Sequence, residues 1–162
     1  MKVVYAVLVI ATFFLAGCAA PASVSIQNAA EISAWRGRLA VRVESDQPQS
    51  FSAGFELTGT PLIGELTLYT PLGSTAAALS WSSQTAVMRS QGEVRHFKSL
   101  DSLIKQAVGT EIPVVALFAW LAGDNMVIAG WNADLSQHAN GRITARRTAP
   151  APAAELRLVL DK

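Results

Sequence analysis

The sequence is poor in the residue types that build catalytic, metal and disulfide sites. It has one cysteine, Cys18, and two histidines, His96 and His138, among 162 residues. Neither histidine has partners at metal-ligand spacing, and a zinc site needs three or four ligands. The P-loop, the Gly-x-Gly-x-x-Gly fingerprint and the Gly-x-Ser-x-Gly elbow are all missing. We therefore expect no metal, no cofactor and no enzymatic activity.

Charge is also scarce, and the two signs are balanced. Charged residues make up 15% of the chain, compared with about 25% in typical soluble proteins. The chain has 13 basic and 12 acidic side chains. A nucleic-acid-binding protein needs a basic face, so we expect no nucleic-acid partner. The low charge indicates more apolar surface than a core of this size requires.

The lone cysteine follows a short apolar run at the start of the chain. Lys2 precedes an apolar segment, 3–15, that is too short for a confident membrane span of about 20 residues. The segment ends in "LAGC", which looks like a bacterial lipobox, so we expect residues 1–17 to be a signal peptide and Cys18 to be lipidated. Acyl chains on Cys18 would anchor the protein to a membrane. The alternative is an ordinary signal peptide with a chance cysteine.

The remainder of the chain divides into a tether and one domain. Residues 18–34 are small, polar and nearly uncharged, which is typical of a flexible tether. Residues 35–162 are enough for a single domain. Ala19 follows the cysteine, where an aspartate would favour retention in the inner membrane of enteric bacteria. Its absence favours the outer membrane.

Most of the domain alternates between apolar and polar residues, as strands do. Short runs of this kind, separated by turn residues, predict nine or ten strands in an antiparallel meander. The expected strands lie near residues 35–44, 51–57, 65–70, 75–81, 85–89, 93–97, 126–129, 131–135, 142–147 and 154–161.

Two segments have helical spacing instead. The first covers 100–108, with Ser99 as its N-cap and Gly109 as its C-cap. The second follows Pro113 and reads "VVALFAWLAG", which is apolar on nearly every side. Such a helix is expected to be buried all round. A domain of this size has little room for that unless the helix lies in a hydrophobic hollow.

One turn carries a residue that does not suit a turn. In "YTPLGST", Pro71 and Gly73 have the chemistry of a tight turn, and Leu72 occupies its tip. An exposed leucine forgoes about 1.5–3 kcal/mol of burial. Either Leu72 contacts a membrane, or it folds back onto Leu68 or a helix.

In four segments, taken in order, the chain resembles the LolB family of outer-membrane lipoprotein receptors. They are "AWRGRLAVRV", "LYTPLGSTAAALSW", "IPVVALFAWLAG" and "GWNADL". The resemblance implies an all-β fold: an open antiparallel half-barrel of about eleven strands, similar to LolA and LolB, with short helices covering an apolar cavity. It also implies that the protein accepts lipoproteins from the periplasmic carrier LolA and inserts them into the outer membrane without covalent chemistry.

The resemblance assigns roles to particular residues. Pro71, Leu72 and Gly73 would form a membrane-insertion loop. The covering helix would place Leu117, Trp120 and Leu121 in the cavity. Strand alternation adds wall candidates, although a shift of one residue in register would turn each strand over. These wall candidates are Phe51, Phe55, Leu66, Leu68, Leu79 and Trp81.

The expected partners are LolA, the acyl chains of lipoprotein cargo and the inner leaflet of the outer membrane. The protein would be a monomer, lipid-anchored and facing the periplasm. Two alternatives remain: a lipid-anchored binding module for another apolar ligand, such as a free lipid or glycolipid, and a structural lipoprotein with a filled core. A cluster of Arg142, Arg146 and Arg147 could meet anionic head groups or an acidic carrier, or could belong to a solvated edge strand.

Overall fold

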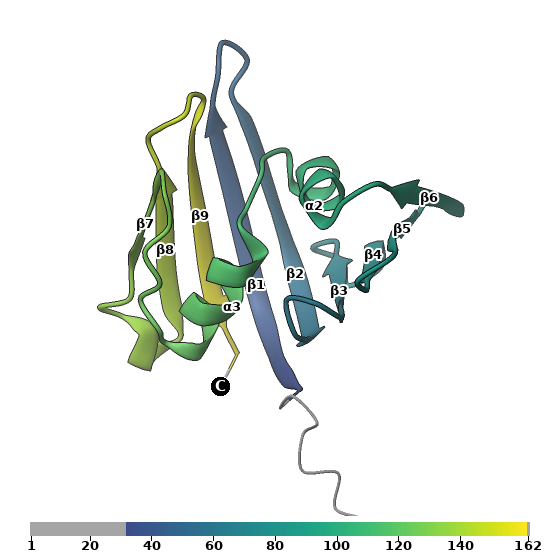
Figure 1. Ribbon diagram of the computed structural model, residues 1–162, viewed down its shortest axis with the longest axis horizontal. Coiled ribbons are helices and arrows are strands. Elements are labelled where there is room, and N and C mark those ends of the chain that lie inside the picture. Colours follow the sequence, from purple (N-terminus) through teal and green to yellow (C-terminus); the bar gives the residue numbers. More distant parts are fainter. Residues whose placement is uncertain (1–31, 162) are drawn as a thin grey trace, which may run out of the picture.

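The computed structural model describes residues 32–161, which form one nine-stranded antiparallel sheet and two α-helices. Figure 1 shows the sheet with both helices in front of it. The signal peptide and Cys18 lie outside the described residues, as does most of the tether. The strands are β1 (Ser33–Glu44), β2 (Gln49–Gly59), β3 (Gly64–Tyr69), β4 (Thr75–Trp81), β5 (Ala86–Ser90), β6 (Glu93–Phe97), β7 (Trp131–Asp134), β8 (Arg142–Arg147) and β9 (Ala153–Leu160).

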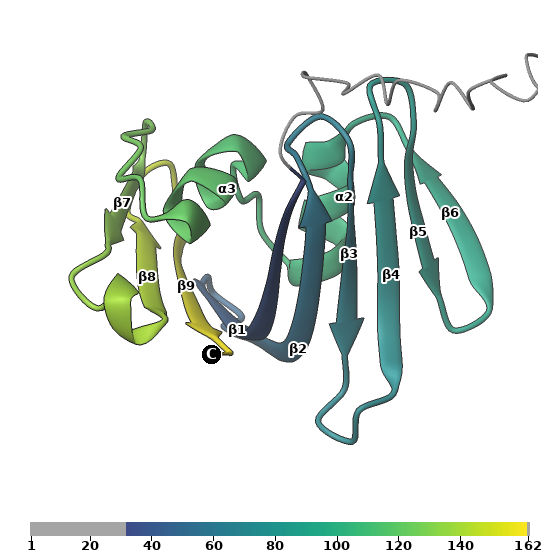
Figure 2. The same cartoon turned by 90° about the horizontal axis from the view of Figure 1, so that it is seen from below.

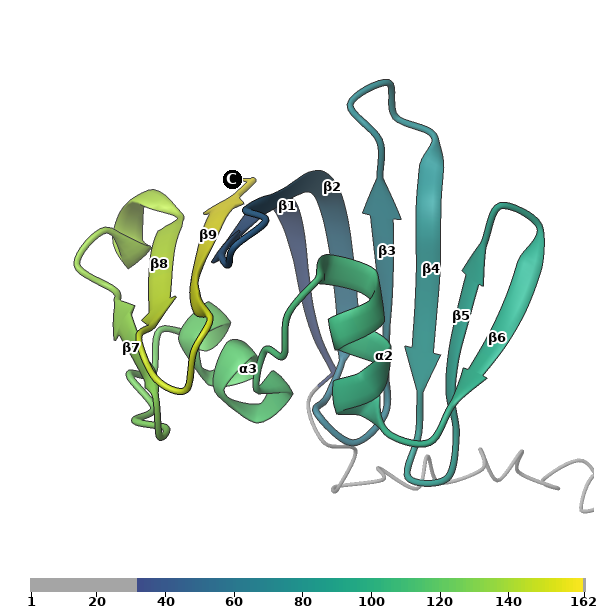
Figure 3. The ribbon, with the colours of Figure 1, turned by 90° about the horizontal axis from the view of Figure 1, so that it is seen from above.

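The sheet is open, with the strand order β6-β5-β4-β3-β2-β1-β9-β8-β7. It bends around the helices as a half-barrel (Figure 3), which confirms the expected fold class. Strand alternation decides which face is concave: on β1, Leu39, Val41 and Val43 are buried, and the residues between them are exposed. A strand face that buries alternate residues must pack on a second layer, and here the helices supply it.

Nine strands are described, fewer than the eleven that the resemblance implies. The expected strand at 126–129 does not form, and only an isolated bridge joins Ile128 to Trp131. The chain turns back at Gly130, which has φ 82°. In addition, the carbonyl of Met126 accepts a hydrogen bond from the Trp120 indole at 3.0 Å, a side-chain partner in place of a neighbouring strand.

The two helices begin and end where the sequence predicts. Helix α2 (Leu100–Val108) is capped by Ser99, whose hydroxyl accepts from the Ser102 N–H, and it ends at Gly109 in the left-handed conformation. Helix α3 (Val114–Ala122) follows Pro113 and ends at Gly123. A 3-10 turn, η1 (His138–Asn140), joins β7 to β8.

Helix α3 is less buried than its composition predicts. Phe118 packs edge-on against Trp35 of β1 and Trp81 of β4, with ring centroids 5.4 and 6.4 Å away. Val115, one turn before Phe118, is 55% exposed. No element of the described chain lies over this helix in Figure 1. Its exposed residues, Val115 and Ala122, share one stripe of the helix that faces solvent.

Candidate functional site

The candidate site is the hollow between the concave face of the sheet and the two helices. Its deepest part is a cavity of about 30 Å³, which is room for roughly one water molecule. Only apolar side chains line it, and they come from both layers. They are Leu39, Phe55, Leu57, Leu66, Leu156 and Leu158 from the sheet, and Ile104, Val108, Ile112, Leu117 and Leu121 from the helical layer.

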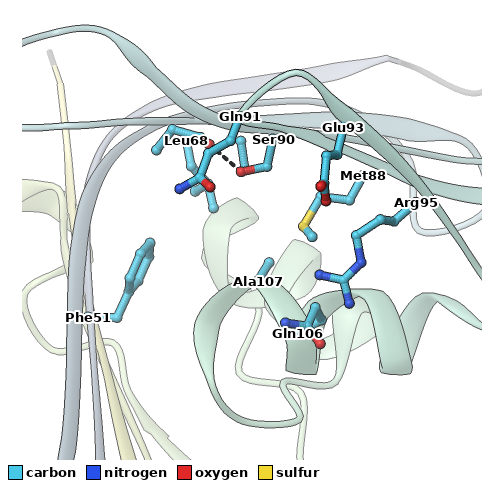
Figure 4. A pocket seen from close by; sticks show the side chains of 11 residues that line it. Phe51, Leu68, Met88, Ser90, Gln91, Glu93, Arg95, Gln106 and Ala107 are labelled. Carbon is cyan, nitrogen blue, oxygen red and sulfur yellow. Dashed lines mark hydrogen bonds between the residues drawn. The ribbon is translucent and has the colours of Figure 1, made fainter.

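A wider cavity of about 310 Å³ opens between strands β2–β6 and helix α2. Phe51 lies on one side, with Met88, Glu93 and Arg95 on the other (Figure 4). Its lining is mixed, because Ser90, Gln91 and Gln106 add polar groups to an apolar wall that includes Leu68, Ala76, Ala77 and Ala107. This mixed lining suits a mouth that meets both apolar chains and the polar groups attached to them.

A third cavity, of about 180 Å³, lies next to the other two along α2. It shares Phe51 and Ala107 with the mouth, and Val108 with the deep cavity. The hollow is therefore a line of spaces that begins open and partly polar and ends closed and apolar.

The structure distributes the nine predicted cavity residues over three locations. Phe55, Leu66, Leu117 and Leu121 line the deep cavity. Phe51 and Leu68 line the mouth. Leu79, Trp81 and Trp120 line none of these three spaces and are buried in the surrounding core. The Trp81 indole donates to the Thr60 carbonyl at 3.3 Å, and Trp120 lies 6.0 Å from Trp131 between ring centroids.

Sequence reasoning missed several lining residues. Leu156 and Leu158 on β9, and Ile104 and Val108 on α2, follow the strand and helix periods and could have been found from those patterns. Gln91 and Arg95 at the mouth carry no such signal. They belong to the short β5–β6 hairpin, and only the curvature of the sheet brings them opposite α2.

The TPLG turn presents Leu72 to solvent. Leu72 is 96% exposed, so it does not fold back onto Leu68 or a helix. The turn is held by hydrogen bonds from the Gly73 N–H to the Thr70 carbonyl (2.9 Å) and from the Thr70 N–H to the Ser74 carbonyl (2.8 Å), with Gly73 at φ 84°. The β3–β4 turn projects beyond the neighbouring strand ends in Figure 2.

Tyr69, next to this turn, is held in its neutral form. Its hydroxyl donates to Glu56 Oε2 at 2.8 Å. This hydrogen bond, together with desolvation and the negative charge of Glu56, raises the pKa of Tyr69 above its usual value of 10.0.

Arg147 attaches the helical layer to the sheet. It is buried, and its Nη2 donates to Thr110 Oγ1 at 2.9 Å and to the Pro152 carbonyl at 3.0 Å, while Trp131 lies under the guanidinium. Arg146 instead pairs with Glu155 on the outer face. The predicted cluster of three arginines is therefore split between two faces, and β8 is not an edge strand, because β7 lies outside it.

The described part of the chain has neither a membrane-spanning helix nor a metal-binding cluster. No helix within residues 32–161 is long and apolar enough to cross a membrane. Within the same residues, no three His, Cys, Asp or Glu side chains gather in a way that could hold a metal ion.

These features define a class of protein: an open β half-barrel whose concave apolar face is covered by short helices. The family model described as "Outer membrane lipoprotein LolB" matches residues 33–153, and the chain belongs to this family.

Individual relatives agree with the family model. Proteins named outer-membrane lipoprotein LolB are 32% identical over 121 residues in Shewanella loihica, covering 70% of this chain and 55% of that protein. The protein of that name in Bordetella petrii is 27% identical over 173 residues, which cover 91% of this chain and 87% of that protein. The chain spans about half the length of the Shewanella relatives that it matches.

Proposed function

We propose that this protein is an outer-membrane receptor for lipoproteins. It accepts them from the periplasmic carrier LolA, holds their acyl chains in the hollow under α2 and α3, and inserts them into the inner leaflet of the outer membrane. The observation that carries the proposal is the line of cavities from a partly polar mouth to an all-apolar end. Membership of the LolB family supports it.

The deep cavity is too small for an acyl chain in the closed arrangement. At about 30 Å³ it holds no more than a few atoms, so α2 and α3 must move away from the sheet to admit cargo. Part of the free energy of burying the chain is then spent on separating these layers. The net affinity is intermediate as a result, which a receptor needs if it is to take cargo from a carrier and release it to a bilayer.

Membrane contact is assigned to the TPLG turn. Lipid would cover Leu72, which the protein leaves exposed, and burial of this side chain recovers about 1.5–3 kcal/mol. Lipidated Cys18 would keep the turn near the membrane, but the hollow itself needs no anchor. The chemistry throughout is non-covalent.

The test is transfer of a labelled lipoprotein from LolA to liposomes. A soluble form without residues 1–17 and with Cys18→Ala is compared with its Leu72→Glu variant. We expect both to take the cargo, and Leu72→Glu to deliver it about tenfold or more slowly, because a charge at the tip removes the gain from burial in lipid.

Val159→Glu is the matched control. It places the same carboxylate on a partly exposed apolar residue of β9, between strands that carry charges on their outer face. Its delivery should equal wild type. If wild type takes no cargo, the receptor proposal fails and another apolar ligand must be sought. If wild type and Leu72→Glu deliver equally, the receptor remains and the role of the turn is refuted.

A further inference from the structure

The β2–β3 turn repeats the sequence of the TPLG turn. Thr-Pro-Leu occurs at 60–62 and again at 70–72, so strand β3 has one copy at each end. The second copy also exposes apolar side chains: Leu62 is 74% exposed and Ile63 is 63% exposed. The proposed delivery mechanism uses Leu72 and gives no role to Leu62 or Ile63.

The β2–β3 turn is rigid, so it holds these side chains outward. The Thr60 N–H donates to the Ile63 carbonyl at 2.8 Å, and the Thr60 hydroxyl accepts from the Ile63 N–H at 3.2 Å. The Trp81 indole, buried in the core, donates to the Thr60 carbonyl. Because the turn is tied to the core in this way, the exposure of Leu62 and Ile63 is built into the fold.

The hairpin between the two turns carries a single charged residue, Glu65. No charged residue occurs from 66 to 88, and Glu65 is the one charge between 57 and 88. The outward positions of β3 and β4 include Glu65, Thr67, Tyr69, Ala78 and Ser80. The outer faces of β1, β8 and β9 instead carry exposed arginines and Glu155. The outer surface therefore has a part that carries one charge, Glu65, and has exposed apolar residues at both ends.

The chain that leads to the lipidation site enters at the Leu62 end. Ser33 pairs with Gly59, next to the β2–β3 turn, and Ile32 beside it is 73% exposed. Residues 19–31 connect this point to Cys18. Along the sequence, this end is therefore the part of the described domain nearest to Cys18, the membrane anchor that the proposed function requires.

We infer that Leu62 and Ile63 form a second lipid contact, and that the outer face of the β3–β4 hairpin lies along the bilayer surface. The inference rests on the proposed function. Six residues of β3 separate the turns by roughly 20 Å. If β3 stood upright on Leu72, Leu62 would be far above the lipid. If β3 lies flat, both turns reach the interface, and Tyr69 between them takes a position that tyrosine favours.

The test measures which positions of the lipidated full-length protein touch acyl chains. Leu62→Cys, Leu72→Cys and Gln47→Cys are each labelled with bimane, since the sulfur of lipidated Cys18 is not free to react. Gln47 is on the exposed β1–β2 turn and serves as the control. The proteins are reconstituted in phosphatidylethanolamine–phosphatidylglycerol vesicles with brominated or ordinary chains. We expect the bromines to quench positions 62 and 72, and to leave position 47 bright.

The inference is overturned if the bromines quench the label at position 72 while the label at position 62 stays as bright as that at position 47. That outcome leaves the receptor proposal intact. If the bimane fluorescence at position 62 changes with the density of protein in the vesicles and not with bromination of the chains, Leu62 contacts a second copy of the protein. That result also overturns the inference. If neither turn is quenched, lipid contact fails at both ends, while cargo uptake from LolA is still decided by the separate transfer assay.

A second measurement uses that transfer assay. Leu62→Glu with Ile63→Glu should take cargo as wild type does and deliver it about tenfold or more slowly, since two apolar side chains lose lipid contact. Delivery at the rate of the Val159→Glu control would contradict a flat orientation.

Discussion

Glu155 lies on the outer face of β9 between two arginines. Arg146 Nε is 2.7 Å from its Oε2, and Arg157 Nε is 2.6 Å from its Oε1. Partial burial raises the pKa of Glu155, but the hydrogen bonds and charges of the two arginines outweigh this, and the net pKa is below the usual 4.5. The ion pair between Arg146 and Glu155 joins β8 to β9 across the outer face.

Stability should depend on this carboxylate at acid pH. A pKa lowered by folding adds stability above the unfolded value of about 4.5, and this contribution is lost as pH falls through the folded value. We expect Glu155→Gln to unfold more easily at neutral pH and to lose less stability on acidification than wild type. Urea unfolding at a series of pH values measures both effects.

Asp46→Asn is the control, because Asp46 is exposed on the β1–β2 turn and forms no ion pair in the described structure. Equal acid slopes for wild type and Glu155→Gln would show that the arginine pair contributes nothing. Hydrogen bonds from Lys105 to Glu111 and from Ser136 to Asp134 also lower the pKa values of these two carboxyl groups. Glu155→Gln therefore removes only part of the loss of stability at acid pH.

At the scale of elements, α3 is the part that must both close the hollow and move. Phe118 holds it down between Trp35 and Trp81, and the closed cavity lies beneath its Leu117 and Leu121. Arg147 holds the linker before it, through Thr110. Two further hydrogen bonds involve the C-terminal part of the helix, between the Trp120 indole and the Met126 carbonyl and between His138 and the Leu121 carbonyl.

Phe118→Ala should loosen this lid. Removing a buried phenylalanine typically costs about 3–5 kcal/mol of unfolding free energy and leaves a cavity. We expect a less stable protein that binds more of an apolar dye. Denaturant unfolding and dye titration measure the two quantities.

Val115→Ala is the matched control on the same helix, since Val115 faces solvent. It should leave both stability and dye binding close to wild type. Reduced dye binding by a folded Phe118→Ala variant would indicate that Phe118 contacts the ligand directly and is not simply a clamp.

The elements differ in how far the sequence could predict them. Helix α2 was predictable because Ser99, Gly109 and the apolar spacing between them act locally. The segment 126–129 was predicted as a strand and is not one, because the chain turns back at Gly130 and an isolated bridge from Ile128 to Trp131 replaces a strand pairing. The exposed side of α3 was also missed, since composition does not tell whether another layer covers a helix.

At the scale of the whole molecule, the question is whether the hollow opens or is simply a filled core. A single-chain lysophospholipid below its micelle concentration should enter an openable hollow. At a hundredfold excess over its Kd it would raise the unfolding free energy by about 2.7 kcal/mol. Thermal unfolding with and without the lipid measures this.

The control ligand has the same head group and a chain of two carbons. It should leave the unfolding temperature unchanged, because stabilisation comes from the buried chain. If the long-chain lipid also has no effect, the protein is a structural lipoprotein with a filled core, and the receptor proposal fails with it.

By itself the sequence determined the features that depend on neighbours along the chain. These are the strand alternation, the caps of α2, the Thr-Pro-Leu turns and the "LAGC" segment ending at Cys18. The similarity of its motifs to those of the LolB family could also be recognised from the sequence. The period of the side chains and the chemistry of the turns are local, so both can be predicted without knowledge of the fold.

The tertiary structure decided what depends on contacts between distant segments. It placed Phe55 and Leu117 on the deep cavity but Trp81 and Trp120 in the core, and it turned Arg147 inward while Arg146 faces out. It also put Leu62 and Leu72 at opposite ends of one hairpin whose single charged residue is Glu65. The curvature of the sheet and the packing of two helices against it produce these outcomes, and no local pattern encodes them.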